Sequence, residues 1–304
     1  MIERVFSHQD QIYFIHGDST HPEWDTFLSS LPGGVDLVLM DPPFNIADKG
    51  KVTKTHGKIY SNREAWGGDF QDSFSAESYT RLLGNFLARA FAILNDGGSL
   101  VSFIDRRYAG IFAGLAEVCG FLYKNMVTFV KTNCVPKVRA TNFGSATEVA
   151  VWLIKPNTGR TPSGGRVAKT KPRIFHNEKA RRGCRTSDGQ LDIQRYHNTH
   201  SSNVFFYTIG SKRTGHPCEK YVGQLEPLIR TLSTSVTENG GFVLDLCAGG
   251  FNSGLVAYEK NRRYVGFEID QYYWSCGSSI LNHMIQNPGI KIPRLLKIQP
   301  KAER

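Results

Sequence analysis

The sequence predicts an α/β fold, with a mostly parallel sheet and helices on both faces. Short apolar runs rich in β-branched and aromatic residues alternate with longer runs of helical periodicity, an order typical of such folds. The chain has 304 residues, enough for one large core with a small insertion. From Pro156 to about Asn203 the periodicity fades and Gly, Pro, Ser, Arg and Lys dominate. We therefore expect this segment to be separate from the sheet core.

The expected elements follow from these two periodicities. The glycines of Asn95-Asp96-Gly97-Gly98 separate the first helix from the strand after it. Strands are predicted at Ile12–His16, Val35–Met40, Ser99–Ile104, Asn125–Lys131, Thr147–Ile154, Phe242–Leu246 and Tyr264–Glu268. Helices are predicted at Ala76–Leu94, Ala109–Cys119, Tyr221–Ser233, Ser253–Lys260 and Gln271–Gln286.

The composition excludes several classes of protein. A hydrophobic fraction of 40% and an aromatic fraction of 12% are typical of a globular chain and not of a disordered one. No apolar run is long enough to cross a membrane, and the first residues lack the pattern of a secretory signal. We therefore expect a cytoplasmic protein. The six cysteines are scattered singly, without a CxxC pair, which favours reduced thiols.

No metal site is expected. The nearest approach to a metal-binding cluster has a spacing that matches no zinc module. It consists of His176, Cys184, His197 and His200.

Positive charge is concentrated in the middle of the chain. The formal net charge is +10. Between residues 155 and 185 there are many Lys and Arg residues, and the only acid is Glu178. Such a stretch indicates either phosphate contacts with nucleic acid or a solvated charged loop, and the charge alone does not separate the two.

An apolar strand leads into the segment Asp41-Pro42-Pro43-Phe44. The prolines stiffen the loop and leave carbonyl acceptors. The Asp41 side chain and a proline carbonyl can together accept both hydrogens of an amino group, and Phe44 can stack on a flat base. Ligands of open α/β sheets bind beyond the carboxyl ends of the strands, where this loop lies. The motif therefore favours a site for an aromatic amine over an ordinary Asp-Pro turn.

A second strand end carries a turn of small residues, from Asp245 to Gly254, and the next strand ends at Glu268. Glycines let the backbone approach a ligand, and an acid at the tip of the second strand can accept hydrogen bonds from ribose hydroxyls. This arrangement predicts an adenosine site. It lacks the GxGxxG spacing, so nothing favours NAD.

Together these segments resemble the β-class S-adenosylmethionine-dependent DNA amino-methyltransferases, the N6-adenine/N4-cytosine family. Asp41-Pro42-Pro43-Phe44 is similar to their DPPY/F catalytic motif, and the turn from Asp245 is similar to their cofactor loop. The catalytic motif precedes the cofactor loop, as in the β class. His216-Pro-Cys-Glu-Lys220 resembles the HPTQK segment, and 127–133 and 148–155 resemble two strands of the family. The likeness covers about residues 11–155 and 204–285.

Three departures from the family pattern stand out. Cys218-Glu219 replaces Thr-Gln of HPTQK, the segment 249–253 replaces Gly-Ser-Gly-Thr-Thr, and Phe129 stands where Trp is common. The loss of hydroxyl groups puts the cofactor affinity in question more than the fold.

The resemblance implies a Rossmann-like methyltransferase fold with a small basic target-recognition insertion. It divides the chain into a catalytic part at 1–155, the insertion at 156–203, a cofactor-binding part at 204–290 and a C-terminal tail at 291–304. The implied reaction is site-specific transfer of methyl from S-adenosylmethionine to N6 of adenine in double-stranded DNA, with the base flipped onto Phe44.

The resemblance also implies three sets of site residues. The catalytic set is Asp41, Pro42, Pro43 and Phe44. The cofactor-binding set is Asp18, His216, Lys220, Asp245, Ala248, Gly249, Gly250, Phe251, Asn252 and Glu268. The DNA-binding set, in the basic segment, is Lys169, Lys171, Arg173, Arg181, Arg182 and Arg185.

Several alternatives stay open. Asp41 favours adenine, because N4-cytosine enzymes usually carry Ser there, yet an N4-cytosine methyltransferase would use the same geometry. A DNA-binding protein that has lost catalysis is the alternative from another class. Protein-glutamine and RNA methyltransferases generally place the cofactor loop first, which argues against them. The resemblance leaves open a homodimer and a cognate restriction nuclease as partners, and it implies a prokaryotic or phage source.

Overall fold

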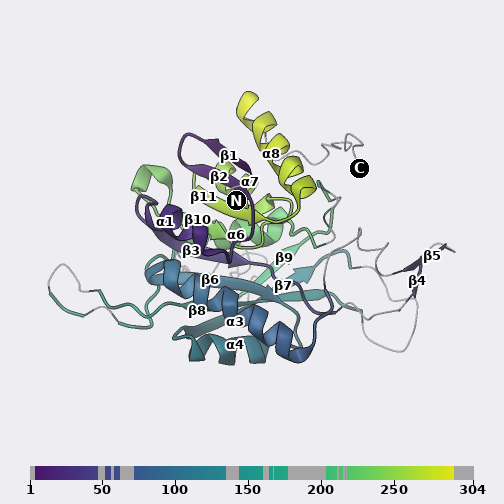
Figure 1. The fold of residues 1–304 in the computed structure, drawn as a ribbon, viewed down its shortest axis with the longest axis horizontal. Coiled ribbons are helices and arrows are strands. Elements are labelled where there is room, and N and C mark those ends of the chain that lie inside the picture. Colours follow the sequence, from purple (N-terminus) through teal and green to yellow (C-terminus); the bar gives the residue numbers. More distant parts are fainter. Residues whose placement is uncertain are drawn as a thin grey trace, which may run out of the picture.

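A nine-stranded sheet covered by helices on both faces organises the molecule (Figure 1). The computed structural model describes residues 4–46, 52–55, 58–61, 72–134, 144–159, 164–166, 168–176, 203–210, 212–214, 216 and 218–290. The strand order is β1-β2-β11-β10-β3-β6-β8-β7-β9, and β4 and β5 form a separate hairpin. The strands are β1 (Arg4–His8), β2 (Ile12–His16), β3 (Val35–Met40), β4 (Val52–Thr55), β5 (Lys58–Ser61), β6 (Leu94–Ile104), β7 (Leu122–Lys131), β8 (Thr147–Ile154), β9 (Val204–Tyr207), β10 (Phe242–Asp245) and β11 (Arg263–Glu268).

The centre of the sheet is parallel. Strands β2, β11, β10, β3 and β6 pair in parallel, and β9 pairs in parallel with β7. β8 is inserted between β6 and β7 and is antiparallel to both, and β1 is antiparallel to β2. The first residues of β8 therefore lie at the edge of the sheet where β3 and β6 end.

The helices form two layers. On one face lie α1 (Asp25–Ser29), α3 (Ala76–Ile93) and α4 (Ala109–Val118). On the other lie α6 (Val222–Leu232), α7 (Asn252–Glu259) and α8 (Gln271–Gln286). Two short 3-10 helices, Pro22–Trp24 and Val236–Glu238, complete the described elements. None of the described helices has the length and apolarity needed to cross a membrane.

Strand β3 shows why the sheet is covered on both sides. Its side chains alternate between the two faces, so Val38 and Met40 pack into the core under α3 and α4. Leu37 and Leu39 pack into the core under α6, α7 and α8. All six residues of the strand are buried, and this near-continuous burial is typical of parallel strands.

The predicted fold class is confirmed. Each predicted strand and helix corresponds to an observed element, and the bounds of β2, β3, β8 and α8 agree with the prediction. Strand β6 begins at Leu94, five positions before the predicted Ser99, because the glycine turn joins the strand with a shift in register against β3. The sequence did not predict β1, β4, β5, β9 or α1.

Candidate active site

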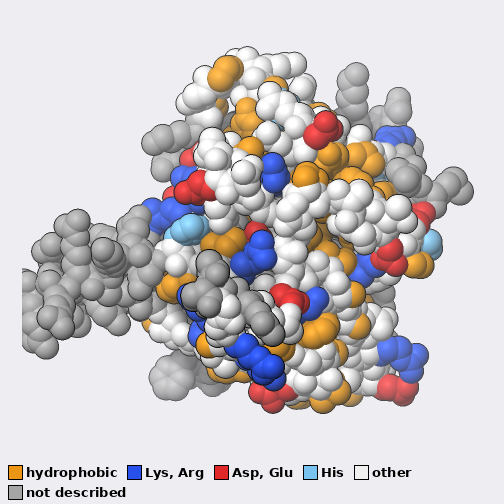
Figure 2. Space-filling view, turned by 90° about the vertical axis from the view of Figure 1, so that its left-hand side faces the viewer, with side chains coloured by type: hydrophobic (Ala, Val, Ile, Leu, Met, Phe, Trp, Pro, Cys, Tyr) orange, Lys and Arg blue, Asp and Glu red, His pale blue; other side chains and the backbone are white. Residues whose placement is uncertain are grey.

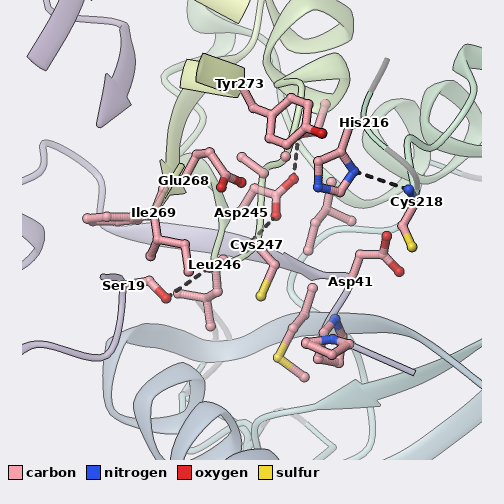
Figure 3. Close-up of a pocket in the computed structure, with 18 of the residues that line it drawn as sticks. Ser19, Asp41, His216, Cys218, Asp245, Leu246, Cys247, Glu268, Ile269 and Tyr273 are labelled. Atoms are coloured by element: carbon pink, nitrogen blue, oxygen red, sulfur yellow. Dashed lines mark hydrogen bonds between the residues drawn. The ribbon is translucent and has the colours of Figure 1, made fainter. Parts of the chain in front are cut away.

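A cavity of about 580 Å³ opens at the carboxyl ends of β2, β11, β10 and β3, which are neighbours in the sheet. Ligands of open α/β sheets bind at this edge. Among the acidic residues that line it, three lie at strand ends: Asp41 follows β3, Asp245 ends β10 and Glu268 ends β11. Figure 3 shows their carboxylates around the cavity. The volume suits a small organic ligand.

Asp41 forms an ion pair with Lys220, whose Nζ lies 2.9 Å from its Oδ1. Burial raises the pKa of Asp41 to about 7, although the Lys220 ammonium acts to lower it. The same ammonium lies 4.8 Å from the ring centroid of Phe44 and 5.1 Å from that of Phe103. A carboxyl group that titrates near neutrality in a cavity is typical of an active site.

Glu148, at the start of β8, is the second carboxylate near Lys220. Asp41, Lys220, Glu148 and Lys131 form a charge cluster. Its Oε2 lies 3.7 Å from Lys220 Nζ, and its Oε1 lies 3.0 Å from Lys131 Nζ. The Tyr207 hydroxyl and the Gln224 amide donate hydrogen bonds to it, at 2.9 and 3.1 Å. Burial alone would raise the pKa of Glu148, but the two lysines outweigh it and lower that pKa to about 2. Glu148 is therefore a stable anion.

Asp245 is fixed from two directions. Ser253 Oγ donates a hydrogen bond to its Oδ2, and the Cys247 backbone N–H donates to its Oδ1 at 3.1 Å. Ser253 Oγ also lies 2.8 Å from the Tyr264 hydroxyl. Burial raises the pKa of Asp245 to about 6, against these two hydrogen bonds, which lower it. The carboxylate is thus oriented before any ligand arrives.

Glu268 sits at the tip of β11. Its Oε1 accepts a hydrogen bond of 2.8 Å from the Asp270 backbone N–H. Burial raises the pKa of Glu268 to about 7, although that N–H lowers it. Asp270 in turn caps α8 by accepting from the N–H groups of Tyr272 and Tyr273. A carboxylate held here can accept hydrogen bonds from both hydroxyls of a ribose.

The turn after β10 depends on unusual backbone conformations. Gly249 has φ +52°, and a Cβ on Gly250 would lie only 2.4 Å from Thr214 Oγ1. Phe251 also has a positive φ, +58°, and its fully buried ring stacks on Phe14 with centroids 4.2 Å apart. The ring therefore packs in the core under the turn and does not line the cavity.

The segment before α6 is organised by Glu219. Its carboxylate accepts hydrogen bonds from the backbone N–H groups of Arg213 and Thr214, at 2.9 and 3.1 Å. It also accepts from Asn252 Nδ2 at 2.8 Å, and the same amide donates to the Lys220 carbonyl at 2.7 Å. Glu219 and Asn252 both depart from the family pattern, and they contact each other.

His216 lines the cavity as a neutral side chain. Its Nδ1 accepts a hydrogen bond from the Cys218 backbone N–H at 3.2 Å, and its ring packs edge-on against Tyr273 at 4.5 Å. Burial, reinforced by Lys212 and Lys220, lowers the pKa of His216 to about 4. The imidazole therefore carries no charge, and with Nδ1 accepting, its one proton is on Nε2.

A second cavity, of about 320 Å³, adjoins the first. Phe44 lines it, and Cys218, Glu219 and Lys220 line both cavities. Asp41 borders the first cavity and Phe44 the second. The Asp-Pro-Pro-Phe segment therefore spans the boundary between them.

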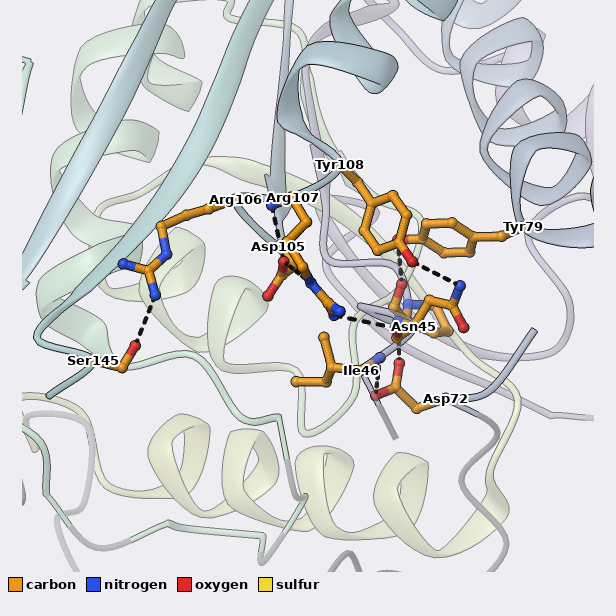
Figure 4. Close-up of polar contacts among 10 residues, drawn as sticks. Asn45, Ile46, Asp72, Tyr79, Asp105, Arg106, Arg107, Tyr108 and Ser145 are labelled. Carbon is orange, nitrogen blue, oxygen red and sulfur yellow. Dashed lines mark hydrogen bonds and ion pairs between the residues drawn. The ribbon is translucent and has the colours of Figure 1, made fainter. Parts of the chain in front are cut away.

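Hydrogen bonds fix the end of the Asp-Pro-Pro-Phe loop and the residues that follow it (Figure 4). The Asp72 carboxylate accepts hydrogen bonds from the N–H of Asn45 and from that of the next residue, at 2.5 and 3.2 Å. Asn45 Oδ1 accepts from the Phe74 N–H at 2.7 Å, and the Tyr79 hydroxyl donates to the Pro43 carbonyl at 2.8 Å. These bonds fix the loop against α3.

Two arginines near the second cavity differ in their partners (Figure 4). Arg106 lines the cavity and donates to the hydroxyls of Ser145 and Thr147, at 3.2 and 3.3 Å. Arg107 Nε lies 2.9 Å from the Asp105 carboxylate. The charge of Arg107 is therefore neutralised locally, whereas Arg106 donates to neutral hydroxyls.

A family model described as DNA methylase, for N6/N4 methyltransferases, matches residues 35–278. The match covers the catalytic motif, the charge cluster and the cofactor loop. The chain belongs to the N6/N4 DNA methylase family.

Individual relatives of this methylase agree in length and fold. Type II methyltransferase M2.DpnII of Streptococcus pneumoniae is 23% identical over 277 residues, 90% of each chain. The M1.HpyAVI–SAM complex superposes with a TM-score of 0.55 at 19% identity, covering 87% of this chain and 96% of that one. The cytosine-N4-specific PvuII DNA methyltransferase superposes equally well, with a TM-score of 0.55 at 17% identity and coverage of 87% and 84%.

The methylase brings most of the predicted catalytic and cofactor-binding residues together. Asp41, Pro42 and Pro43 line the first cavity, and Phe44 lines the second. The predicted cofactor-binding residues that line the first cavity are Asp18, His216, Lys220, Asp245, Ala248, Gly249, Gly250, Asn252 and Glu268. Phe251 is the exception, as described above. Glu148, Asp72 and Arg106 were not singled out by the sequence, because their places depend on strand order and on contacts between distant segments.

The predicted DNA-binding residues that the structure describes do not line either cavity. Lys169, Lys171 and Arg173 belong to the segment after β8, which extends from the end of the sheet opposite to the β4–β5 hairpin (Figure 1). Arg173 Nε lies 3.0 Å from the Asp36 carboxylate, which is buried near the start of β3, and the Arg173 N–H donates to Gly97. These contacts anchor the segment at the amino ends of the parallel strands.

The face at that end of the sheet carries mixed charge. Figure 2 shows Lys and Arg side chains interspersed with acidic ones among the residues that it colours. The predicted DNA contacts Arg181, Arg182 and Arg185 lie outside the described residues, as do Cys184, His197 and His200. Within the described residues, no group of three or more His, Cys, Asp or Glu side chains could hold a metal ion.

Proposed function

We propose that this methylase transfers a methyl group from S-adenosylmethionine to N6 of adenine at specific sites in double-stranded DNA. The observation that carries the proposal is the position of Asp41. Its carboxylate borders the larger cavity, where acids end β10 and β11, while Phe44 three residues later faces the smaller one. One segment thus meets both a cofactor cavity and a base cavity.

The residues of the larger cavity fit S-adenosylmethionine. Glu268 would accept hydrogen bonds from the ribose hydroxyls, and the Asp245 and Asp41 carboxylates suit a ligand that carries a sulfonium and an ammonium group. A Cβ on Gly250 would lie 2.4 Å from Thr214 Oγ1, so only glycine lets this turn pack against Thr214 beside the cavity. When bound, this cofactor supplies an electrophilic methyl group on sulfur.

Asp41 and the Pro42 carbonyl would each accept one hydrogen of the target amine. This arrangement orients the nitrogen lone pair, and the Asp41 carboxylate stabilises the positive charge that develops on nitrogen as the methyl group is transferred. The amine then releases one proton, which Asp41 can accept because its pKa lies at about 7. Phe44 would stack on the base, which has to leave the duplex because its amine is unreachable in the stack.

Asp41 also supports adenine over cytosine. In the family that the sequence resembles, N4-cytosine enzymes usually carry Ser at this position, whereas a carboxylate is typical of N6-adenine enzymes. We further assign target recognition to the insertion at 156–203, between the catalytic part at 1–155 and the cofactor-binding part at 204–290.

The test is to incubate the protein with S-adenosylmethionine and unmethylated genomic DNA and to map modified bases by single-molecule sequencing. We expect N6-methyladenine within one short motif. Asp41→Asn keeps the size of the side chain and removes its charge, so turnover should fall by about 10²–10³-fold while cofactor binding, measured by calorimetry, persists. Glu77→Gln, at an exposed surface pair on α3, is the control.

The possible results separate the alternatives. N4-methylcytosine in place of N6-methyladenine would contradict the adenine assignment and keep the mechanism. No modified base, together with cofactor binding, would contradict the DNA substrate. Absence of cofactor binding at millimolar concentration would leave the DNA-binding protein without catalysis as the explanation.

A further inference from the structure

The Lys220 ammonium occupies the place that the proposed function assigns to the target amine. It lies 2.9 Å from Asp41 Oδ1 and 4.8 Å from the centroid of the Phe44 ring. Its side chain is only 10% exposed, and it lines both cavities. An N–H donor on the carboxylate, next to the face of the aromatic ring, is the arrangement required of a flipped base.

The amine and the ammonium cannot both use this place. Both donate to the Asp41 carboxylate, and the ammonium lies over the Phe44 ring, on which the base would stack. Their charges also conflict: the amine becomes positive during methyl transfer, and a second cation on the same carboxylate would oppose that charge. Lys220 therefore has to leave Asp41 before the reaction.

Glu148 offers the ammonium a second partner without a large movement. Its Oε2 is already 3.7 Å from Lys220 Nζ. The Glu148 carboxylate is held in place by Lys131, Tyr207 and Gln224. A small rotation of the Lys220 side chain would exchange one carboxylate for the other and keep the buried cation paired, as a buried charge requires.

We propose that Lys220 is a placeholder for the target amine, and that Glu148 is a positioning residue which draws Lys220 away from Asp41 when the base enters. The inference rests on the proposed function. Without DNA, Lys220 compensates the buried Asp41 carboxylate. With the base in place, the amine donates to the Asp41 carboxylate, and Lys220 forms its ion pair with Glu148 instead.

The experiment is a double-variant cycle of Glu148→Gln, Lys220→Met and both changes together. Once the methylation motif has been mapped, a duplex with 2-aminopurine at the target position reports base entry by its fluorescence. Calorimetry with S-adenosylmethionine and circular dichroism report cofactor binding and folding. Lys220→Met is judged on base entry and not on turnover, because loss of the cation also changes the charge state of Asp41.

Glu148→Gln should lower the fluorescence change and kcat by roughly tenfold, because Lys220 then has no second partner, and leave cofactor affinity unchanged. Lys220→Met should increase the fluorescence change above that of the wild type. The double variant should behave like Lys220→Met, since Glu148 acts only through Lys220. Glu226→Gln, which removes an acid on α6 that pairs with Lys260, should match the wild type.

Two results would overturn the proposal while wild-type methylation of adenine persists. If the two single effects add in the double variant, Glu148 does not act through Lys220. If Lys220→Met abolishes cofactor binding, Lys220 is a cofactor ligand and not a placeholder. A wild-type protein that methylates no adenine would refute the proposed function, and the placeholder role with it.

Discussion

Phe251 provides the sharpest test of how the cofactor loop is supported. The loop ends in a phenylalanine whose ring is fully buried and stacked on Phe14 at 4.2 Å. Gly277 makes room for this ring, because a Cβ there would lie 2.8 Å from Phe251 Cδ2. The ring therefore fills a space in the core directly under a turn that otherwise consists of small residues.

Phe251→Ala should lower the free energy of unfolding by about 4 kcal/mol, within the range for truncating a buried phenylalanine. The backbone at this position adds a second, independent expectation. Because φ is +58°, alanine keeps the strain of a left-handed conformation, whereas glycine relieves about 1–2 kcal/mol of it and loses about 0.5–1 kcal/mol to backbone entropy. Phe251→Gly should therefore be about 0.5–1 kcal/mol more stable than Phe251→Ala.

Urea unfolding followed by tryptophan fluorescence measures both variants against the wild type. The expected order, glycine above alanine, is the reverse of the order found at most buried positions. A loss below about 1 kcal/mol for Phe251→Ala would show that the ring is not part of the core. A glycine variant less stable than the alanine variant would refute the argument from the backbone conformation.

Three further predictions concern charge. Because burial raises the pKa of Asp41 to about 7 and the reaction needs its carboxylate, kcat/KM for DNA should rise with pH through about 7 and fall on acidification; a flat profile from pH 6 to 8 would contradict this role. Arg181→Ala with Arg182→Ala should reduce the slope of log affinity against log salt by roughly 1.8, at about 0.9 per phosphate contact; an unchanged slope would remove both residues from the DNA interface. Arg106→Gln should reduce the same slope by about 1. Arg107→Gln should leave the slope unchanged, because the charge of Arg107 is paired with Asp105. Equal effects of the two variants would contradict a phosphate contact specific to Arg106.

Local patterns predicted much of this fold. The run at Val35–Met40 is apolar except at Asp36, and this pattern predicted the strand, whose six residues are all buried. Strand β1 was missed because its five residues are largely exposed, so they carry no apolar pattern. Strand β9 was missed because it has only four residues and follows the irregular basic segment.

The candidate site was predictable where motifs lie on consecutive residues. The sequence identified Asp41, Asp245 and Glu268 because each lies at the carboxyl end of a predicted strand or directly after it. It could not identify Glu148 as a partner of Lys220, since that contact depends on β8 running against its neighbours and starting at the edge where they end. Contacts between distant segments of this kind depend on topology, which local periodicity does not determine.

The brace on the Asp-Pro-Pro-Phe loop has a thermodynamic consequence. Asp72 and Asn45 satisfy backbone groups of the loop and of the chain before α3, and Tyr79 holds the Pro43 carbonyl. The conformational entropy of this loop is therefore lost when the protein folds, not when DNA binds. Under the proposed function, the free energy of DNA binding is then available for unstacking the target base. The proposed reaction then requires the nucleic acid to change shape, while the Asp-Pro-Pro-Phe loop is a fixed template to which it adapts.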